Sequence, residues 1–346
     1  MSRIAEIDKN LKIDTKLNLD DVIFINAEEE PVKLYGVFKE NGSFRRIPET
    51  LARETSEGVH YLHNLTAGGR VRFSTDSEYI AVTAKMHKIE KAPHFPMCGS
   101  SGFDLYADGD FCSSFVPPVN MTDGYEGVIR LTGKRMREIN INFPLYSGVK
   151  ELYIGVQKDS FVKEPRPYKY EKPFVYYGSS ITQGGCASTP GMSYQSIVSR
   201  RFDADFINLG FSGNARGEEC MANYIKDLDM SLFVLDYDHN APTVEHLMNT
   251  HEKFFKAVRE KNPTLPIIMM SRPKYKLTDD EKKRLEVIRE TYENAIKNGD
   301  KNVYLIDNVK LTELCLGQGT VDNCHPTDFG FASMAKAVCD VIEKIL

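Results

Sequence analysis

Residues 173–185, PFVYYGSSITQGG, join an apolar run to a glycine-flanked pair of serines. The run Phe174–Tyr177 is typical of a buried strand, and the Gly-Ser-Ser string after it is typical of a tight turn before a helix. A hydroxyl on such a turn lies at the strand's carboxyl end, where the first N–H groups of the helix face a developing anion. Ser180 is therefore a candidate nucleophile. The alternative is that Ser179, Ser180 and Thr182 cap the helix or bind phosphate.

The sequence after this stretch alternates apolar runs with longer segments of helical period. The expected strands are Phe206–Leu209, Leu232–Tyr237, Pro266–Met270 and Val303–Ile306. The helical stripes are Leu247, His251, Phe254, Phe255 and Val258, then Phe331, Met334, Ala335, Val338, Ile342 and Ile345. This alternation predicts a doubly wound α/β domain with a parallel sheet. Ligands of such sheets bind outside the carboxyl ends of the strands.

The first half of the chain has a different pattern, with short β-rich runs between turn signals such as Asn41-Gly42. The expected strands are Val22–Ile25, Lys33–Phe38, Val59–Leu62, Arg70–Phe73, Tyr79–Met86, Val128–Leu131, Glu138–Phe143 and Glu151–Val156. Short strands with little helical period predict an antiparallel β-sandwich or jelly roll. The proline-rich stretch Phe161–Pro173 is interpreted as a linker. We therefore expect an all-β domain at residues 1–165 and an α/β domain at residues 174–346.

The composition is that of an ordinary globular protein, with 346 residues of which 41% are hydrophobic and 27% charged. The net charge of −5 provides no overall positive field to hold a nucleic acid. The amino terminus lacks the apolar stretch of a secretory signal, and the apolar runs are too short to span a bilayer. The seven scattered cysteines indicate reduced thiols. We expect a cytoplasmic protein with no membrane or nucleic-acid partner, and the sequence does not indicate an oligomeric state.

Glycine-rich and polar segments follow the next two expected strands. The first reads NLGFSGNARG, residues 208–217, and the second reads DYDHNAP, residues 236–242. The Gly213 N–H and the Asn240 side-chain amide are neutral donors of the kind that stabilises a tetrahedral oxyanion. The alternative is ordinary turn chemistry, for which Gly and Asn are the usual residues.

The last candidate segment, DNCHPTDFG at residues 322–330, precedes the final amphipathic helix. An Asp and a His three residues apart on a tight loop let the carboxylate orient the imidazole while the other ring nitrogen faces a serine. We expect Ser180 Oγ within hydrogen-bond reach of His325, with Asp322 on the far side of the ring. The alternative is a loop histidine followed by a helix cap.

These segments, in this order, resemble the SGNH (GDSL-type) hydrolase family, whose conserved blocks supply a nucleophilic Ser, a Gly and an Asn for the oxyanion hole, and a His held by an Asp. Matched residue by residue, the resemblance implies Ser180 as the nucleophile. It implies Gly213 and Asn240 as oxyanion-hole donors beside the Ser180 N–H. It also implies that His325 and Asp322 complete a catalytic triad.

Two departures and one further motif accompany this resemblance. Ser179 stands where the family has an acid outside the charge relay, a change that we expect to be tolerated. The third block, usually Gly-x-Asn-Asp, reads DHNA at residues 238–241, which leaves His239 open as a substrate contact or a strand-end residue. The string Gly102-Phe103-Asp104-Leu105-Tyr106 is similar to the GxDLY motif of a sandwich domain that precedes the hydrolase domain in one bacterial subgroup.

The resemblance implies a serine esterase that works through an acyl-enzyme and needs no metal or organic cofactor. Architectures of this kind resemble carbohydrate esterases that remove acetyl groups, so we expect a small-molecule or saccharide ester as substrate. The small, polar loop Gly184–Gly191 favours short acyl groups. Aromatic residues that can stack on a sugar are Tyr106, Tyr176, Tyr177 and Tyr194, and the alternative is that they belong to the core, where aromatic residues are more often found.

Two other functions stay open from the sequence. The first is a carbohydrate-binding or interaction protein with an inactive α/β half, which the presence of all the site residue types disfavours. The second is a metal-dependent hydrolase. Its ligands would be Asp236, Asp238 and His239. Adjacent positions on a strand point to opposite faces, so such a short cluster seldom converges on one metal ion.

Overall fold

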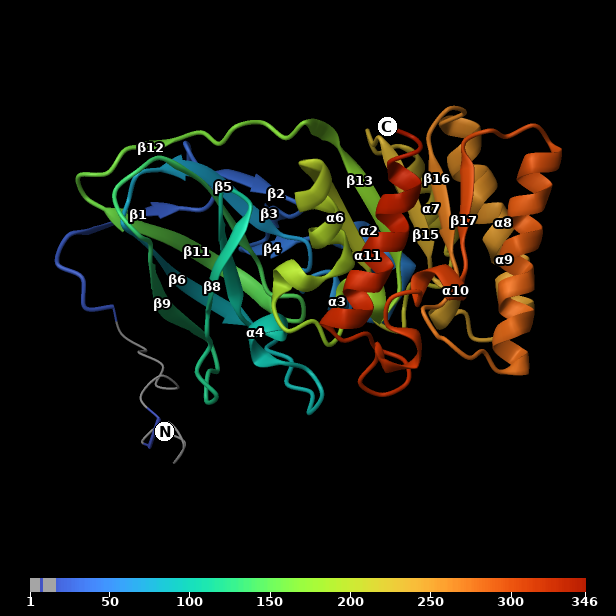
Figure 1. Ribbon diagram of the computed structural model, residues 1–346, viewed down its shortest axis with the longest axis horizontal. Helices are drawn as coiled ribbons and strands as arrows, with labels where there is room; N and C mark the ends of the chain where they lie inside the picture. The colour runs from blue at the N-terminus through green and yellow to red at the C-terminus, as the bar shows by residue number, and fades with distance from the viewer. Residues whose placement is uncertain (1–6, 9–16) are drawn as a thin grey trace.

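The computed structural model describes residues 7–8 and 17–346 of the chain, and Figure 1 shows its strands gathered into a β-rich part and an α/β part. Two antiparallel sheets form the β-rich part, in the strand orders β1-β11-β6-β9 and β12-β5-β10-β7-β8, with β2 also paired to β5. A separate hairpin joins β3 and β4. The strands are β1 Val22–Asn26, β2 Lys33–Tyr35, β3 Phe38–Glu40, β4 Ser43–Arg45, β5 Arg70–Thr75, β6 Tyr79–His87, β7 Phe103–Ala107, β8 Asp110–Phe115, β9 Gly124–Arg130, β10 Arg137–Asn142, β11 Gly148–Gln157 and β12 Val162–Lys163.

The α/β part contains one parallel sheet in the order β14-β13-β15-β16-β17. Its strands are β13 Tyr170–Gly178, β14 Ala204–Gly210, β15 Leu232–Asp236, β16 Ile267–Met270 and β17 Val303–Ile306. The helices are α5 Ser180–Gln183, α6 Tyr194–Phe202, α7 Glu219–Lys226, α8 Val244–Lys261, α9 Asp279–Lys297, α10 Asn308–Leu311 and α11 Asp328–Ile342. Helix α6 packs on α11, and α8 packs on α7 and α9, so helices cover both faces of the sheet (Figure 1).

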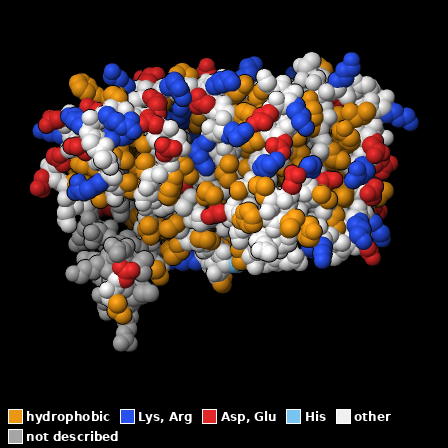
Figure 2. Space-filling model, viewed as in Figure 1, with side chains coloured by type: hydrophobic (Ala, Val, Ile, Leu, Met, Phe, Trp, Pro, Cys, Tyr) orange, Lys and Arg blue, Asp and Glu red, His pale blue; other side chains and the backbone are white. Residues whose placement is uncertain are grey.

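This architecture confirms the predicted fold class, a doubly wound parallel sheet preceded by an all-β sandwich. Both predicted helical stripes are buried against the sheet, except Ile345, which lies beyond the end of α11. The predicted domain boundaries, residues 1–165 and 174–346, stay a prediction. Figure 2 shows acidic and basic side chains interspersed on the displayed face of the molecule. Within the described residues, no helix combines the length and apolar character needed to cross a bilayer.

One predicted strand is wrong, because Val59–Leu62 lies within a helix. The short helices α2 Glu49–Thr55, α3 Glu57–Leu62 and α4 Met97–Ser100 interrupt the β-rich part. Ser56 caps α3 by accepting a hydrogen bond from the backbone N–H of Val59. Val59 and Leu62, one helical turn apart, are both buried against the core of the α/β part. Tertiary packing therefore overrides the β propensity of this short apolar run.

The predicted linker Phe161–Pro173 also contains regular structure, since it includes β12 and the start of β13. Strand β12 pairs with the edge of β5, and β13 continues directly into the parallel sheet. Strands β7 and β8 were not predicted, although they are joined at Asp108-Gly109, a dipeptide typical of hairpin turns.

Side chains of the β-rich part bind the backbone of the α/β part at two places near the carboxyl ends of its strands. Arg46 donates hydrogen bonds from Nη1 to the carbonyl oxygens of Gly210 and Asn208 at 2.5 and 3.2 Å. Asp104 is fully buried and accepts hydrogen bonds from the Gly191 N–H at 2.6 Å and from Asn142 Nδ2 at 2.7 Å. The Asp of the GxDLY string therefore holds the segment that follows α5.

We predict that Asp104→Ala destabilises the folded chain. The substitution leaves two buried donors without an acceptor, and each unsatisfied donor costs about 1–3 kcal/mol. Urea unfolding is expected to show a loss of roughly 2–5 kcal/mol in the free energy of unfolding. The matched control is Asp110→Ala, at an exposed position of β8, with an expected change within about 0.5 kcal/mol. Equal losses in both variants would contradict this role of Asp104.

Candidate active site

The carboxyl ends of β13, β14 and β15 are level with one another. Gly178, the last residue of β13, lies opposite Gly210 of β14 on one side and Asp236 of β15 on the other. The segments that follow the three strands therefore begin side by side at one edge of the sheet. This is the edge at which ligands of open α/β sheets bind.

The first segment is a tight turn that leads from β13 into α5. Ser179 caps the helix, because its Oγ accepts a hydrogen bond from the Ile181 N–H at 3.1 Å. A Cβ atom on Gly178 would lie 2.1 Å from Thr182 Oγ1, so only glycine lets α5 fold back onto the strand. Ser180 is the first residue of α5, and its N–H therefore has no acceptor within the helix.

The side chain of Ser180 is connected to His325 and Asp322 by hydrogen bonds. Ser180 Oγ lies 2.9 Å from His325 Nε2, and His325 Nδ1 lies 2.8 Å from Asp322 Oδ2. With the ring proton on Nδ1, donated to the carboxylate, Nε2 is free to accept the serine proton. Asp322 Oδ1 also accepts the backbone N–H groups of Cys324 at 3.0 Å and His325 at 2.7 Å, which fixes the short loop around the ring.

Asp322 is held in its ionised form. Burial alone would raise the pKa of its carboxyl, but the hydrogen bonds from the His325 ring and backbone outweigh burial and lower the pKa to about 2. The carboxylate is therefore negative at neutral pH, and it can stabilise a positively charged imidazolium beside it.

The second segment follows β14 and carries Gly213, whose φ of +68° is in the left-handed region that favours glycine. Gln183 Oε1 accepts the Ser212 N–H at 3.1 Å, which ties this segment to α5. Asn240, from the third segment, donates a hydrogen bond from Nδ2 to Phe211 O at 2.9 Å. A side-chain amide has two N–H groups, so one remains for another acceptor. The roles of Gly213 and Asn240 as oxyanion donors stay a prediction.

The third segment, after β15, is fixed by two arginines that no sequence motif had marked. Asp238 is buried and forms an ion pair with Arg272, with Oδ1 2.5 Å from Nη2. Arg284 donates from Nη1 to the carbonyl oxygens of Asp238 at 3.1 Å and Ala241 at 2.9 Å. These contacts hold the backbone on both sides of Asn240.

The acidic cluster considered as a metal site does not converge. Asp236 accepts a hydrogen bond from Thr182 Oγ1 at 2.9 Å, whereas Asp238 is paired with Arg272. The Nδ1 of His239 lies 3.8 Å from Cys324 Sγ, and burial lowers the pKa of this histidine to about 4, so its ring is neutral. In the described part of the chain these three side chains do not form a group that could hold a metal ion.

The β-rich part contributes aromatic residues that the sequence analysis missed. Tyr146 donates a hydrogen bond to the Ser180 carbonyl oxygen at 3.1 Å. Phe95 packs edge-on against Tyr146, with ring centroids 4.5 Å apart, and its ring lies 6.3 Å from that of His325. The tyrosines considered as sugar platforms belong instead to the core. They are the buried residues Tyr106, Tyr176, Tyr177 and Tyr194.

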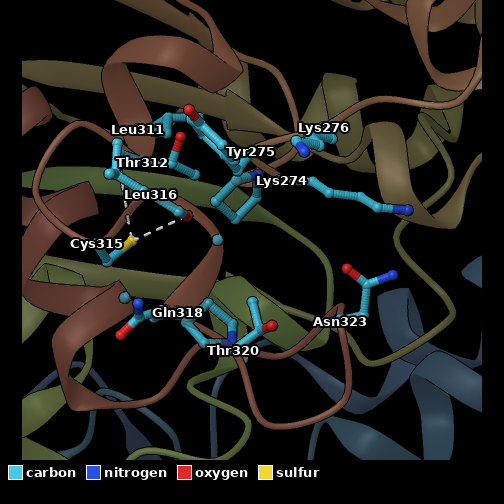
Figure 3. A pocket seen from close by; sticks show the side chains of 15 residues that line it. Lys274, Tyr275, Lys276, Leu311, Thr312, Cys315, Leu316, Gln318, Thr320 and Asn323 are labelled. Carbon is cyan, nitrogen blue, oxygen red and sulfur yellow. Dashed lines mark hydrogen bonds between the residues drawn. The ribbon is translucent and has the colours of Figure 1, made fainter.

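Two cavities flank these segments. One, of about 740 Å³, lies beside the Gly213 segment and is lined by Tyr61, Glu90, Phe95, Ser212 and Asn214 among others. The other, of about 400 Å³, borders the loop that carries Asp322 and His325. In Figure 3, Lys274 and Asn323 lie on one side of it and Cys315 on the other. The first cavity combines residues of both parts of the chain with the neighbours of Gly213 on either side, Ser212 and Asn214.

The fold and this site define a carboxylic ester hydrolase of the SGNH type with an amino-terminal GxDLY domain. The chain belongs to the GDSL-like lipase/acylhydrolase family, whose model matches residues 171–343. A second family model, described as the GxDLY N-terminus of SGNH-hydrolase-type esterases, matches residues 22–162. Among curated proteins, none matches the chain significantly.

Solved structures of similar proteins cover nearly the whole chain. A Bacteroides ovatus protein described as a GDSL-like lipase is 30% identical to this chain. The alignment covers 94% of this chain and 98% of that protein, with a TM-score of 0.83. A salicylyl-acyltransferase from a tetracycline biosynthetic pathway is 18% identical, with 94% and 97% covered and a TM-score of 0.76. An acetyl xylan esterase from Butyrivibrio proteoclasticus is 13% identical, with 94% and 98% covered and a TM-score of 0.59. The last two similarities establish the fold alone.

We predict a pH-dependent contribution of Asp236 to stability. Burial raises its pKa to about 8 in the folded chain, whereas an unfolded aspartate has a pKa of about 3.9. Between these values the folded state binds the extra proton, so the free energy of unfolding falls as the pH rises from about 4 to about 8.

Asp236→Asn cannot ionise, so we expect it to lack this decline, which amounts to at most about 1.4 kcal/mol per pH unit. Urea unfolding of both proteins at pH 5, 7 and 9 measures the difference. The control is Asp110→Asn, an exposed position whose pH profile should follow the wild type. Parallel profiles of Asp236→Asn and wild type would show that Asp236 is ionised in the folded chain.

Proposed function

We propose that the chain is a serine esterase that removes short acyl groups, acetyl above all, from a carbohydrate or another small alcohol. Ser180, His325 and Asp322 act as its catalytic triad, and no cofactor takes part. The observation that carries this proposal is the continuous series of hydrogen bonds, 2.9 Å from Ser180 Oγ to His325 Nε2 and 2.8 Å from His325 Nδ1 to Asp322 Oδ2.

In the first half-reaction His325 Nε2 takes the proton of Ser180 Oγ, and the oxygen attacks the ester carbonyl. The imidazolium then donates that proton to the departing alcohol oxygen as the carbonyl–alcohol bond breaks. In the second half-reaction His325 takes a proton from water, and the water oxygen attacks the acyl-enzyme. The acyl–Oγ bond then breaks, and His325 returns this proton to Ser180 Oγ as the acid is released. The ionised Asp322 stabilises the imidazolium in both steps.

The tetrahedral intermediate carries its negative charge on the former carbonyl oxygen. The proposed donors to this oxygen are the N–H groups of Ser180 and Gly213 and the free N–H of the Asn240 amide. Fixed donors of this kind stabilise the transition state without reorganising, and the loss of one donor typically costs roughly 10²–10³ in turnover. The hydrogen bond from Asn240 to Phe211 O supports the proposal, because it anchors the amide on the segment that carries Gly213.

The proposed alcohol moiety is a sugar, bound in the 740 Å³ cavity beside the Gly213 segment. Tyr61, which is 42% exposed, and Phe95 offer ring faces to the apolar side of a sugar, and Glu57 and Glu90 offer acceptors for its hydroxyl groups. Fold relatives that are named carbohydrate esterase and acetyl xylan esterase suggest the same substrate class.

We predict that Ser180→Ala abolishes ester hydrolysis. Removing a triad nucleophile typically lowers kcat by about 10⁴–10⁶. The matched control is Ser179→Ala, which removes the helix cap at about 0.5–2 kcal/mol of stability and leaves the nucleophile in place. The activity of both variants is measured as turnover of p-nitrophenyl acetate and of acetylated xylo-oligosaccharides. Retained activity in folded Ser180→Ala would contradict the proposal.

We predict that acetyl esters are preferred over long acyl esters. A buried methylene contributes only about 0.8 kcal/mol, and the loop Gly184–Gly191 that follows the nucleophile is small and polar, so it offers little apolar surface to a long acyl chain. kcat/KM is therefore expected to fall from acetyl through butyryl and octanoyl to palmitoyl esters, by at least about tenfold at octanoyl. A maximum at octanoyl or longer would indicate a lipase-like channel.

A further inference from the structure

Three side chains that can bind a metal ion meet around His325, which is hydrogen-bonded to the proposed nucleophile. His94 comes from the segment between β6 and α4, Cys186 follows α5, and His325 is the proposed base. One ligand atom of each lies within 4.8 Å of the other two. Among the residues that the structure describes, this is the only group of at least three histidine, cysteine or carboxylate side chains that converges in this way.

Two of these side chains have no other hydrogen-bonding role. Within the described ranges, neither the His94 ring nitrogens nor Cys186 Sγ form a hydrogen bond. His94 is exposed, and its ring centroid lies 4.7 Å from that of Phe95 and 5.8 Å from that of His325. Cys186 is a free cysteine. An imidazole pair with a thiolate is a ligand set that suits Zn²⁺.

The third ligand is already oriented as it would be in a zinc site. Asp322 accepts a hydrogen bond from His325 Nδ1 at 2.8 Å, which leaves Nε2 as the atom with a free lone pair. Carboxylate–histidine–zinc arrangements use the same contact to fix the ring and raise its basicity. The contact that prepares His325 to accept the serine proton therefore also prepares it to bind a metal ion.

We propose that His94, Cys186 and His325 form an inhibitory zinc site that includes the proposed catalytic base. Zn–N bonds of about 2.0–2.1 Å and a Zn–S bond of about 2.3 Å place the ligand atoms of a tetrahedral site roughly 3.3–3.6 Å apart. Atoms within 4.8 Å therefore reach these positions by moving roughly 1 Å, mostly through rotation of His94. As the Zn–S bond forms, the Cys186 thiol gives its proton to solvent.

Zinc in this site stops the reaction because it occupies the lone pair of His325 Nε2, which otherwise takes the proton of Ser180. Inhibition by this route rests on the proposed function, whereas zinc binding does not. The site would make the esterase sensitive to free zinc, and a chelator would reverse the inhibition. The proposed hydrolysis itself uses no metal.

Calorimetric titration of the chelator-treated full chain with zinc chloride tests binding. We expect one equivalent of zinc per chain, bound at least about tenfold more weakly by Cys186→Ser. The control is Cys112→Ser, which removes a free thiol on β8 and should bind zinc as the wild type does. The absence of zinc binding by wild type, or equal binding by Cys186→Ser, would overturn the proposal.

Turnover of p-nitrophenyl acetate at increasing zinc concentration tests inhibition. We expect zinc to inhibit the wild type, a chelator to restore it, and His94→Ala to keep its zinc-free activity but need at least about ten times more zinc for half inhibition. Equal zinc sensitivity in His94→Ala would overturn the site. If Ser180→Ala kept full activity, the proposed function would fail, whereas the calorimetric result would still decide whether zinc binds.

Discussion

The register of three parallel strands is the constraint on which the site depends. Gly178 lies opposite both Gly210 and Asp236, so the segments that carry Ser180, Gly213 and Asn240 start from one level. This register requires close backbone approach, because a Cβ atom on Gly210 would lie 2.2 Å from the Gln183 backbone nitrogen. Small residues at the strand ends therefore let α5 sit on the edge of the sheet, where a serine and its donors can face the same substrate atom.

The β-rich part of the chain fixes these segments from outside the sheet. Arg46 holds the backbone at Gly210, Asp104 holds the backbone N–H of Gly191, and Tyr146 binds the Ser180 carbonyl oxygen. A site whose supporting residues are themselves buried and hydrogen-bonded keeps its geometry better than one on free loops. The GxDLY string thus has a physical role in this chain, since its Asp104 joins the two parts next to the segment that follows the nucleophile.

The sequence was sufficient for features with a local signature. The strand-to-helix turn at Ser180, the Asp322 and His325 pair, and the alternation of strands and helices were all predictable, because each depends on residues a few positions apart. Phe95, Tyr146 and Arg272 were not predictable, since only the tertiary fold brings them to the strand ends. Helix α3 was missed for the same reason, as its apolar residues pack against a core formed mainly by residues more than a hundred positions later.

In the proposed mechanism Ser180 is the single residue that becomes acylated, and covalent labelling tests this most directly. The full chain is treated with a serine-directed phosphonate ester, and intact mass, peptide mapping and residual esterase activity are followed together. We expect one phosphonyl group per chain, on the peptide that contains Ser180, with activity lost in proportion to labelling. Complete labelling with retained activity, or loss of activity with the label on another residue, would contradict it.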